Sequence, residues 1–234
     1  MTEYGDLLAA NLAVARERID AAARRAGRDP GEVALIAVTK TQPLERVRLA
    51  YGAGLRVFGE NRVQEARDKI AAWDAPGVTW HLVGHLQGNK AGLACRLFAV
   101  VQSVDSAGLA RRLDGCRPPD APPLPVLLEV NAGRESSKLG FLPGDAFWQA
   151  VPEILALPGL DVWGLMTVAP LAADPETVRP VFRELREIRD ELRRRYPERP
   201  WPHLSMGMSD DYAVAVEEGA TMVRLGRALF GPRA

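Results

Sequence analysis

Lysine is scarce in this sequence, so each lysine is a candidate for amine chemistry. The chain has 30 Lys and Arg residues, of which four are lysines (Lys40, Lys69, Lys90 and Lys138) and 26 are arginines. Arginine supplies positive charge, but only lysine readily loses its proton and forms an imine with a carbonyl compound. The question at each lysine is whether an amine is needed there.

Lys40 follows the apolar run VALIAVT, where a strand is expected to end. It shares strand parity with Ile36 and Val38, so its side chain is expected on the apolar side of that strand. Desolvation lowers the pKa of an ammonium group and makes a neutral amine available to attack an aldehyde. The alternative is a lysine that reaches from the strand end to solvent. In a chain that otherwise prefers arginine, we favour the imine.

The other lysines give weaker signals. Lys69 lies in a helical pattern and is expected at an exposed position without a chemical role. Lys90 and Lys138 are expected to make contacts at a rim or in packing.

Two segments near the C-terminus predict a site for a phosphate. The run SMGMSDD places Ser205 and Ser209 directly before a helix expected over 212–218, where backbone N–H groups and hydroxyls suit an anion. The alternative is a plain helix cap at Ser209 or Asp210. In the run VRLGRALFG, Gly226 allows a ligand to approach the backbone closely. The loops after the last two strands of a (β/α)₈ barrel commonly bind phosphate.

Arg224 lies inside the last expected strand. A buried arginine must be paired, so an internal salt bridge is one reading. If a pyridine ring occupies the barrel mouth, Arg224 can instead donate to the ring nitrogen. Because arginine stays protonated, that nitrogen would remain unprotonated and the ring would be a poor electron sink.

His81 and His85 are four residues apart in HLVGH, but a metal site is not favoured. Gly84 interrupts any helix, no third ligand lies at metal spacing, and His203 is distant in sequence. Hydrogen bonding or packing is expected for these histidines. The sequence has neither a GxSxG elbow nor a GxxxxGK[ST] loop.

These residues are expected to be positioned by eight strands that alternate with helices. An amphipathic helix over 7–26 comes first, and the clearest later helix, over 176–196, should present to solvent a charged face whose side chains are paired. The strand-like runs are 33–39, 55–59, 78–83, 97–101, 124–130, 160–166, 203–206 and 221–225. Together they predict an α/β fold with one domain over 1–234, a single TIM-type (β/α)₈ barrel with an extra N-terminal helix. A six-stranded doubly wound sheet is the alternative, but no GxGxxG follows the first strand.

The composition limits the cellular compartment and the partners that can be expected for this protein. The formal net charge is +0, which argues against nucleic-acid binding through net positive charge. Two cysteines without a CxxC pair, no leader sequence and no apolar run of about 18 residues predict a cytoplasmic protein that does not cross a membrane.

Seven motifs, in order and over nearly the whole chain, closely resemble the pyridoxal phosphate homeostasis proteins, which are similar to the N-terminal barrel of alanine racemase. They are AVTKTQP, FGENRVQEA, WHLVGHLQGNK, EVNAGRESSKLG, GLMTVAP, LSMGMSDD and VRLGRALFG. The resemblance implies pyridoxal 5′-phosphate held as an internal aldimine on Lys40, with Asn61 near the ring and Arg224 facing the pyridine nitrogen. It also implies phosphate contacts from Ser205, Ser209 and Gly226.

Two further positions complete the expected site. His85, at a strand end, is also expected to bind the cofactor. Family members often carry a small hydroxyl residue where this chain has Arg227, so the role of Arg227 stays open.

The expected function is cofactor binding without catalytic turnover, in cofactor homeostasis. Alanine racemase uses a second domain that delivers a Tyr base, whereas this sequence ends at Ala234, after the eighth unit. The alternatives are a weak amino-acid racemase, an aldolase that takes a base from the neighbourhood of Glu60, His85 and Asp210, or a barrel in which Lys40 is merely structural. The expected partners are the small-molecule cofactor and, transiently, cofactor-dependent enzymes, and the chain is compatible with a monomer.

Overall fold

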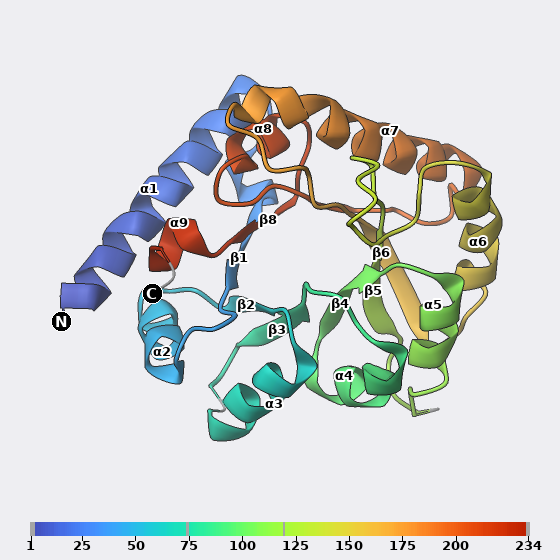
Figure 1. Cartoon of the computed structure of the whole chain (residues 1–234), viewed down its shortest axis with the longest axis horizontal. Coiled ribbons are helices and arrows are strands. Elements are labelled where there is room, and N and C mark those ends of the chain that lie inside the picture. The colour runs from blue at the N-terminus through green and yellow to red at the C-terminus, as the bar shows by residue number, and fades with distance from the viewer. Residues whose placement is uncertain (1–2, 74, 119, 233–234) are drawn as a thin grey trace.

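Eight parallel strands close into a barrel in the computed structural model, which describes residues 3–73, 75–118 and 120–232 (Figure 1). Each strand pairs with the next along the chain, and β8 pairs with β1. The strands are β1 (Ala34–Val38), β2 (Val57–Glu60), β3 (Thr79–Leu82), β4 (Val100–Val104), β5 (Leu124–Glu129), β6 (Leu160–Met166), β7 (His203–Ser205) and β8 (Met222–Leu225). The predicted barrel is therefore confirmed.

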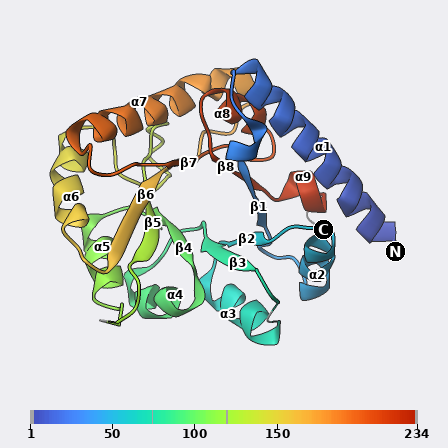
Figure 2. The same ribbon diagram turned by 180° about the vertical axis from the view of Figure 1, so that it is seen from behind.

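Helices cover the outside of the barrel, as the two opposite views show (Figures 1 and 2). The α-helices are α1 (Glu3–Arg25), α2 (Leu44–Gly52), α3 (Val63–Ala72), α4 (Ala91–Leu97), α5 (Ala107–Asp114), α6 (Asp145–Leu155), α7 (Arg179–Arg195), α8 (Tyr212–Glu217) and α9 (Arg227–Phe230). Among the described residues, 3₁₀ turns at Pro30–Glu32, Gly88–Lys90 and Pro175–Val178 precede β1, α4 and α7. Within the three described ranges, no helix is both long and apolar enough to span a membrane.

The extra N-terminal helix begins earlier than predicted and packs on the last units of the barrel. Its buried stripe includes Leu8, Leu12 and Ile19. Near its start, the Tyr4 hydroxyl donates to the carbonyl oxygen of Phe230 at 2.9 Å. Helix α1 thus joins the first residues of the described chain to the last helix of the barrel.

The predicted helix over 176–196 begins as a 3₁₀ turn and becomes α-helical at Arg179. Pro180 has no N–H group, and such a residue is tolerated in the first turn of a helix, where that group has no partner inside the helix. Charged side chains of α7 are paired, as predicted, but some of their partners belong to α8 or directly follow it, so this part of the face is only partly exposed.

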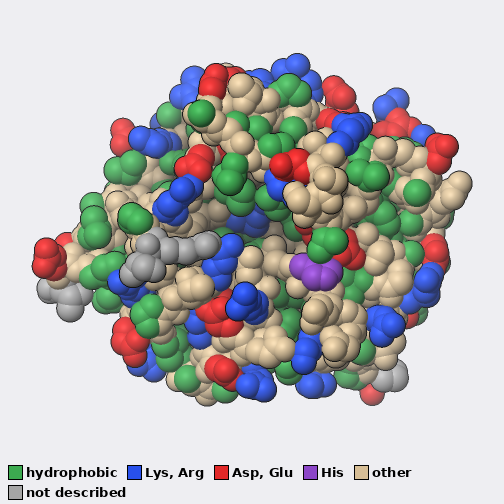
Figure 3. Space-filling view, in the orientation of Figure 1, with side chains coloured by type: hydrophobic (Ala, Val, Ile, Leu, Met, Phe, Trp, Pro, Cys, Tyr) green, Lys and Arg blue, Asp and Glu red, His purple; other side chains and the backbone are tan. Residues whose placement is uncertain are grey.

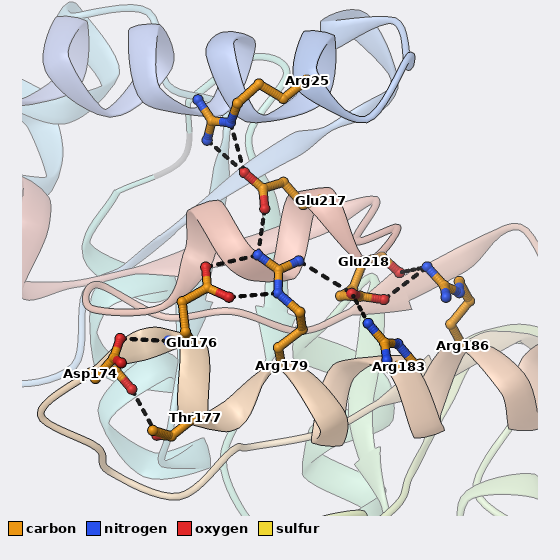
Figure 4. Close-up of polar contacts among 9 residues, drawn as sticks. All are labelled: Arg25, Asp174, Glu176, Thr177, Arg179, Arg183, Arg186, Glu217 and Glu218. Carbon is orange, nitrogen blue, oxygen red and sulfur yellow. Dashed lines mark hydrogen bonds and ion pairs between the residues drawn. The ribbon is translucent and has the colours of Figure 1, made fainter.

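This pairing is an ion-pair network that links three helices (Figure 4). Arg179 contacts Glu176 in the preceding turn at 2.7 Å, and in α8 it contacts Glu217 at 2.6 Å. Glu217 also pairs with Arg25 of α1 at 2.7 Å. Glu218, directly after α8, accepts from Arg179 at 3.2 Å, and Arg183 and Arg186 approach the same carboxylate.

The barrel has an apolar outer layer and a mixed interior. The outer layer fills the space between strands and helices with a large cluster of buried residues that includes Phe58, Leu82 and Phe182. Inside the barrel, Ile36, Leu127, Met166 and Met222 form a small apolar cluster. Other interior positions carry buried polar side chains, among them His81, Gln102, Ser205 and Arg224, which form part of the candidate site.

Candidate functional site

The C-terminal ends of the strands gather most of the predicted residues at one end of the barrel. Lys40 follows β1, Asn61 follows β2, His85 follows β3 and Gly226 follows β8. In the register of β1 and β8, Ile36 pairs with Arg224. A Cβ atom at Gly226 would lie 3.4 Å from the carbonyl oxygen of Val38. The ends of β1 and β8 are therefore in direct contact beside Lys40.

The backbone around Lys40 is held in an uncommon conformation. Thr39 continues the sheet beyond β1, since its N–H group donates to the carbonyl oxygen of Gly59 at 2.9 Å. Thr41, on the other side of Lys40, has φ of 63°, a left-handed conformation that costs free energy in a β-branched residue. Lys40 thus lies at a sharp change in chain direction at the strand end.

Lys69 is buried, which corrects the prediction that it is exposed. Its side chain is 9% exposed, and its Nζ atom donates to Glu60 at 2.7 Å and to Glu65 at 2.8 Å. Lys69 also donates to the carbonyl oxygen of Thr39 at 2.6 Å. The helical pattern placed Lys69 near the edge of the apolar stripe of Val63 and Ala66, and its aliphatic chain follows that stripe into the protein.

A chain of buried hydrogen bonds crosses the barrel interior from Arg224. Its guanidinium donates to the Ser205 hydroxyl at 2.7 Å and to the carbonyl oxygen of Thr167 at 2.7 Å. Ser205 donates in turn to Gln102 at 2.6 Å, and the Gln102 amide nitrogen donates to Nδ1 of His81 at 2.8 Å. The predicted alternative for Arg224, an internal salt bridge, is replaced by neutral acceptors that fix the guanidinium in place.

In the barrel interior, Arg224 is charged and His81 is neutral at neutral pH. Burial lowers the pKa of Arg224 to about 10, partly offset by the charges of Glu129 and Asp211, so the guanidinium is protonated at neutral pH. Burial, with a smaller contribution from His203, lowers the pKa of His81 to about 4. Neutral His81 can therefore accept the hydrogen bond from Gln102.

Glu129, at the end of β5, is a titratable group that the sequence motifs do not single out. Burial raises its pKa to about 7, against the opposing charge of Arg224, and Asp105 raises it further. Its signal in the sequence is its parity with Leu127, which lies in the inner apolar cluster. A carboxyl group that titrates near neutral pH thus lies close to the positive charge of Arg224.

The two segments predicted to hold a phosphate meet in space. The N–H group of Ala228 donates to the Ser209 hydroxyl at 3.0 Å, so the loop after β7 touches the turn after β8. Gly207 adopts φ of 93°, and a Cβ atom there would lie 2.7 Å from that of Ala215. Arg227, for which the sequence predicts no role, forms an ion pair with Asp210 at this edge. The Ser205 hydroxyl differs from that of Ser209 because it is committed to Arg224 and Gln102.

Asn61 and His85 are positioned by their neighbours at the other side of the mouth. A Cβ atom at Gly84 would lie 2.5 Å from the carbonyl oxygen of Asn61, so glycine is required for the two loops to approach this closely. Nδ1 of His85 lies 3.2 Å from the Asp105 carboxylate, and the His85 side chain is 46% exposed. His85 therefore lies at the rim.

The packing role expected of Lys138 is met by its contacts. Lys138 donates to the carbonyl oxygen of Ala169 at 2.8 Å and joins the loops after β5 and β6, which is the predicted packing role. Among the described residues, no group of three His, Cys, Asp or Glu side chains could hold a metal ion. Glu60, His85 and Asp210, suggested as bases for an aldolase, are paired separately with Lys69, Asp105 and Arg227.

The surface around this site is mixed in charge. Figure 3 shows acidic and basic side chains interspersed across the face drawn, which is hollowed near its centre. This pattern agrees with the balanced composition of the sequence.

The fold and the site define a class of protein, the (β/α)₈ barrels with a lysine after the first strand and a charged arginine in the last. The family "Alanine racemase, N-terminal domain" matches residues 10–234. A "Pyridoxal phosphate homeostasis protein" of Aquifex aeolicus is 44% identical over 93% of this chain and 94% of its own length. One of Escherichia coli is 43% identical over 97% of both chains. The chain therefore belongs to the pyridoxal phosphate homeostasis protein family.

A solved structure of the same type agrees with this assignment. PipY of Synechococcus elongatus PCC7942, determined with PLP bound, is 38% identical to this chain and superposes with a TM-score of 0.84. The match covers 96% of this chain and 100% of PipY.

Proposed function

We propose that this chain binds pyridoxal 5′-phosphate at the barrel mouth and holds it through Lys40 as a carrier in cofactor homeostasis. The observation that carries the proposal is the pairing of β1 with β8, which places the strand that leads to Lys40 beside Arg224 and Gly226. An amine, a fixed cation and an open glycine turn suit the aldehyde, ring nitrogen and phosphate of this cofactor. PipY, determined with PLP bound, supports the choice of ligand.

Each group at the mouth has a defined part in binding. The Lys40 amine adds to the aldehyde carbon, and one water molecule leaves as the imine forms. Arg224 donates to the ring nitrogen and keeps it unprotonated. The backbone at Gly226 and the Ser209 hydroxyl hold the phosphate, with Ser205 acting through Arg224, while Asn61 lies near the ring and His85 at the rim.

The same geometry argues for a carrier rather than an enzyme. When bound, the cofactor can stabilise a carbanion next to its imine, but an unprotonated ring nitrogen makes it a poor electron sink. The whole chain, residues 1–234, acts as one cytoplasmic barrel domain that exchanges its cofactor with cofactor-dependent enzymes in transient contacts. It requires neither nucleic acid nor a membrane for this role.

A weak racemase is the second candidate, because the match to the alanine racemase N-terminal domain covers residues 10–234. The two candidates differ in exchange of the α-proton of alanine, which is followed by NMR in deuterated water. The carrier predicts no exchange above that of free cofactor, and exchange at enzyme-like rates would establish the racemase.

Titration with pyridoxal 5′-phosphate, followed by visible absorption, tests the role of Lys40. The wild type and the control Lys90→Met, altered at the half-buried lysine that ends the turn Gly88–Lys90, are expected to develop the imine band with one equivalent of cofactor. Lys40→Met should bind the cofactor without this band. An equal band in Lys40→Met, or none in the wild type, would contradict the proposal.

A further inference from the structure

A buried cluster of charged groups lies behind Lys40, on the outer side of the barrel wall. Lys69 of α3, Glu60 at the end of β2 and Glu65 of α3 meet between the strands and the helix. Oε1 of Glu60 accepts from Lys69 at 2.7 Å and from the Thr39 hydroxyl at 2.6 Å. We call Lys69, Glu60 and Glu65 the Lys69 cluster. None of the three is among the cofactor-binding residues proposed above.

Burial of the Lys69 cluster between the barrel and α3 costs desolvation free energy. Glu60 is fully buried and the Lys69 side chain is 9% exposed. Taking both charges out of water costs more than their attraction commonly returns, and apolar side chains of similar size often serve stability as well or better. Among the described residues, Oε2 of Glu60 has no hydrogen-bond partner, so the cluster is not arranged for maximal stability.

The cluster forms hydrogen bonds with the residues on both sides of Lys40. Lys69 donates to the Thr39 carbonyl oxygen at 2.6 Å, and Glu60 accepts from the Thr39 hydroxyl. On the far side, the Thr41 N–H group donates to Glu65 at 2.6 Å. Since Lys69 also pairs with Glu65, one ammonium group connects the residue before Lys40 to the residue after it.

The backbone conformation beside Lys40 is strained and needs stabilising contacts. Thr41 is left-handed, with φ of 63°, and the surrounding structure must hold a β-branched residue in that region. The hydrogen bond from Thr41 to Glu65 is a contact that does so. The chain direction at Lys40, and with it the origin of the Lys40 side chain, depends on this bond.

We propose that Lys69 is a positioning residue, which through Glu60 and Glu65 fixes the backbone of Lys40 so that its amine meets the cofactor aldehyde. This inference rests on the proposed function. Covalent bond formation is sensitive to displacements of about 1 Å. Binding of the ring and phosphate, in contrast, depends on Arg224 and Gly226 in and after β8 and on Ser209 in the loop after β7. Loss of the cluster should therefore slow imine formation and leave non-covalent binding intact.

The test separates these two quantities in one set of variants. The rate of imine formation is followed by stopped-flow absorption after mixing with pyridoxal 5′-phosphate. Non-covalent affinity is measured with pyridoxine 5′-phosphate, which carries an alcohol in place of the aldehyde and forms no imine. Lys69→Met is compared with the wild type and with Lys90→Met.

Lys69→Met should form the imine on the order of 10-fold more slowly or worse, with an unchanged Kd for pyridoxine 5′-phosphate. Lys90→Met should match the wild type in both measurements. An unchanged imine rate in Lys69→Met would overturn the inference, and so would a parallel loss of rate and affinity, which indicates a purely structural role.

Glu65 supplies a second, matched pair of variants should Lys69→Met fail to fold. The Glu65 side chain is 26% exposed, so Glu65→Leu removes the acceptor for Thr41 at a tolerant position, whereas Glu65→Gln retains an acceptor oxygen. Glu65→Leu should slow imine formation and Glu65→Gln should restore most of the rate. Equal rates in the two variants would contradict the inference. Absence of the imine in the wild type would instead contradict the proposed function itself.

Discussion

His81 is the residue whose ionisation should be visible in the stability of the barrel. Its pKa is about 4 in the folded protein because it is buried, against about 6.5 when exposed. Between these values the unfolded state binds more protons than the folded state, so stability falls as the pH falls. A shift of this size corresponds to a loss of roughly 3 kcal/mol between pH 7.5 and pH 4.

The variant His81→Gln, which keeps an acceptor for Gln102, isolates this contribution. Denaturant unfolding at several pH values should show wild-type stability falling more steeply than that of His81→Gln between pH 6.5 and pH 4. Glu129 acts in the opposite direction in both proteins, because its raised pKa stabilises the fold as it takes up a proton. Parallel stability curves would show that His81 is not neutral in the fold.

Residue-level prediction from the sequence succeeded where position along a strand decided the outcome. Lys40, Asn61 and Gly226 lie at strand ends, as their place after apolar runs predicts. It failed for Lys69, because periodicity places a side chain on a helix face but does not show what its terminal atom reaches. Gln102, which connects Ser205 to His81, gave no signal at all, since its role depends on strands far apart in sequence.

At the scale of elements, Arg179 is expected to stabilise the attachment of α7 to α8. It contacts Glu176, Glu217 and Glu218, and its side chain is 23% exposed. Arg179→Met leaves two partly buried carboxylates short of a partner and should lower the free energy of unfolding by about 1–2 kcal/mol. Arg183→Met, at a side chain that is 52% exposed, is the matched control and should cost about 0.5 kcal/mol.

The effect of Arg179→Met should depend on pH in a defined direction. Partial burial alone would raise the pKa of Glu217 and of Glu218, but hydrogen bonds from arginines, Arg179 among them, outweigh burial and leave both lowered. A lowered carboxyl pKa gives stability that is present above the usual value and is lost as the pH falls through the folded value. The difference from wild type should therefore shrink in acid, and a constant difference would contradict this account.

The elements themselves were predicted well because each has a simple pattern. Seven of the eight strands lie at the apolar runs that predict them, and the buried stripe of α1 follows its spacing of three and four residues. The fourth run, 97–101, was placed too early, because it begins at the end of α4, and β4 covers Val100–Val104. Their ends were less predictable, since they depend on local groups such as Pro180 at the start of α7. The pairing of α7 with α8 was missed because both partners look like ordinary surface charges in the sequence.

At the scale of the whole molecule, closure of the barrel brings residues that are far apart in the sequence into one site. The first and last strands are far apart in sequence, and only their pairing brings Lys40 beside Arg224 and Gly226. The count of eight strand and helix units predicted this closure, and the motifs predicted the residues. The buried supports behind them, the Lys69 cluster and the interior chain from Arg224 to His81, required the structure.

The central claim is that Lys40 alone among the lysines holds the cofactor. It is tested by reducing the complex of protein and pyridoxal 5′-phosphate with borohydride, followed by digestion and mass spectrometry of the lysine-containing peptides. We expect one reduced adduct per chain, located on Lys40. An adduct mainly on Lys69, Lys90 or Lys138, or a chain that stays unlabelled at saturating cofactor, would contradict it.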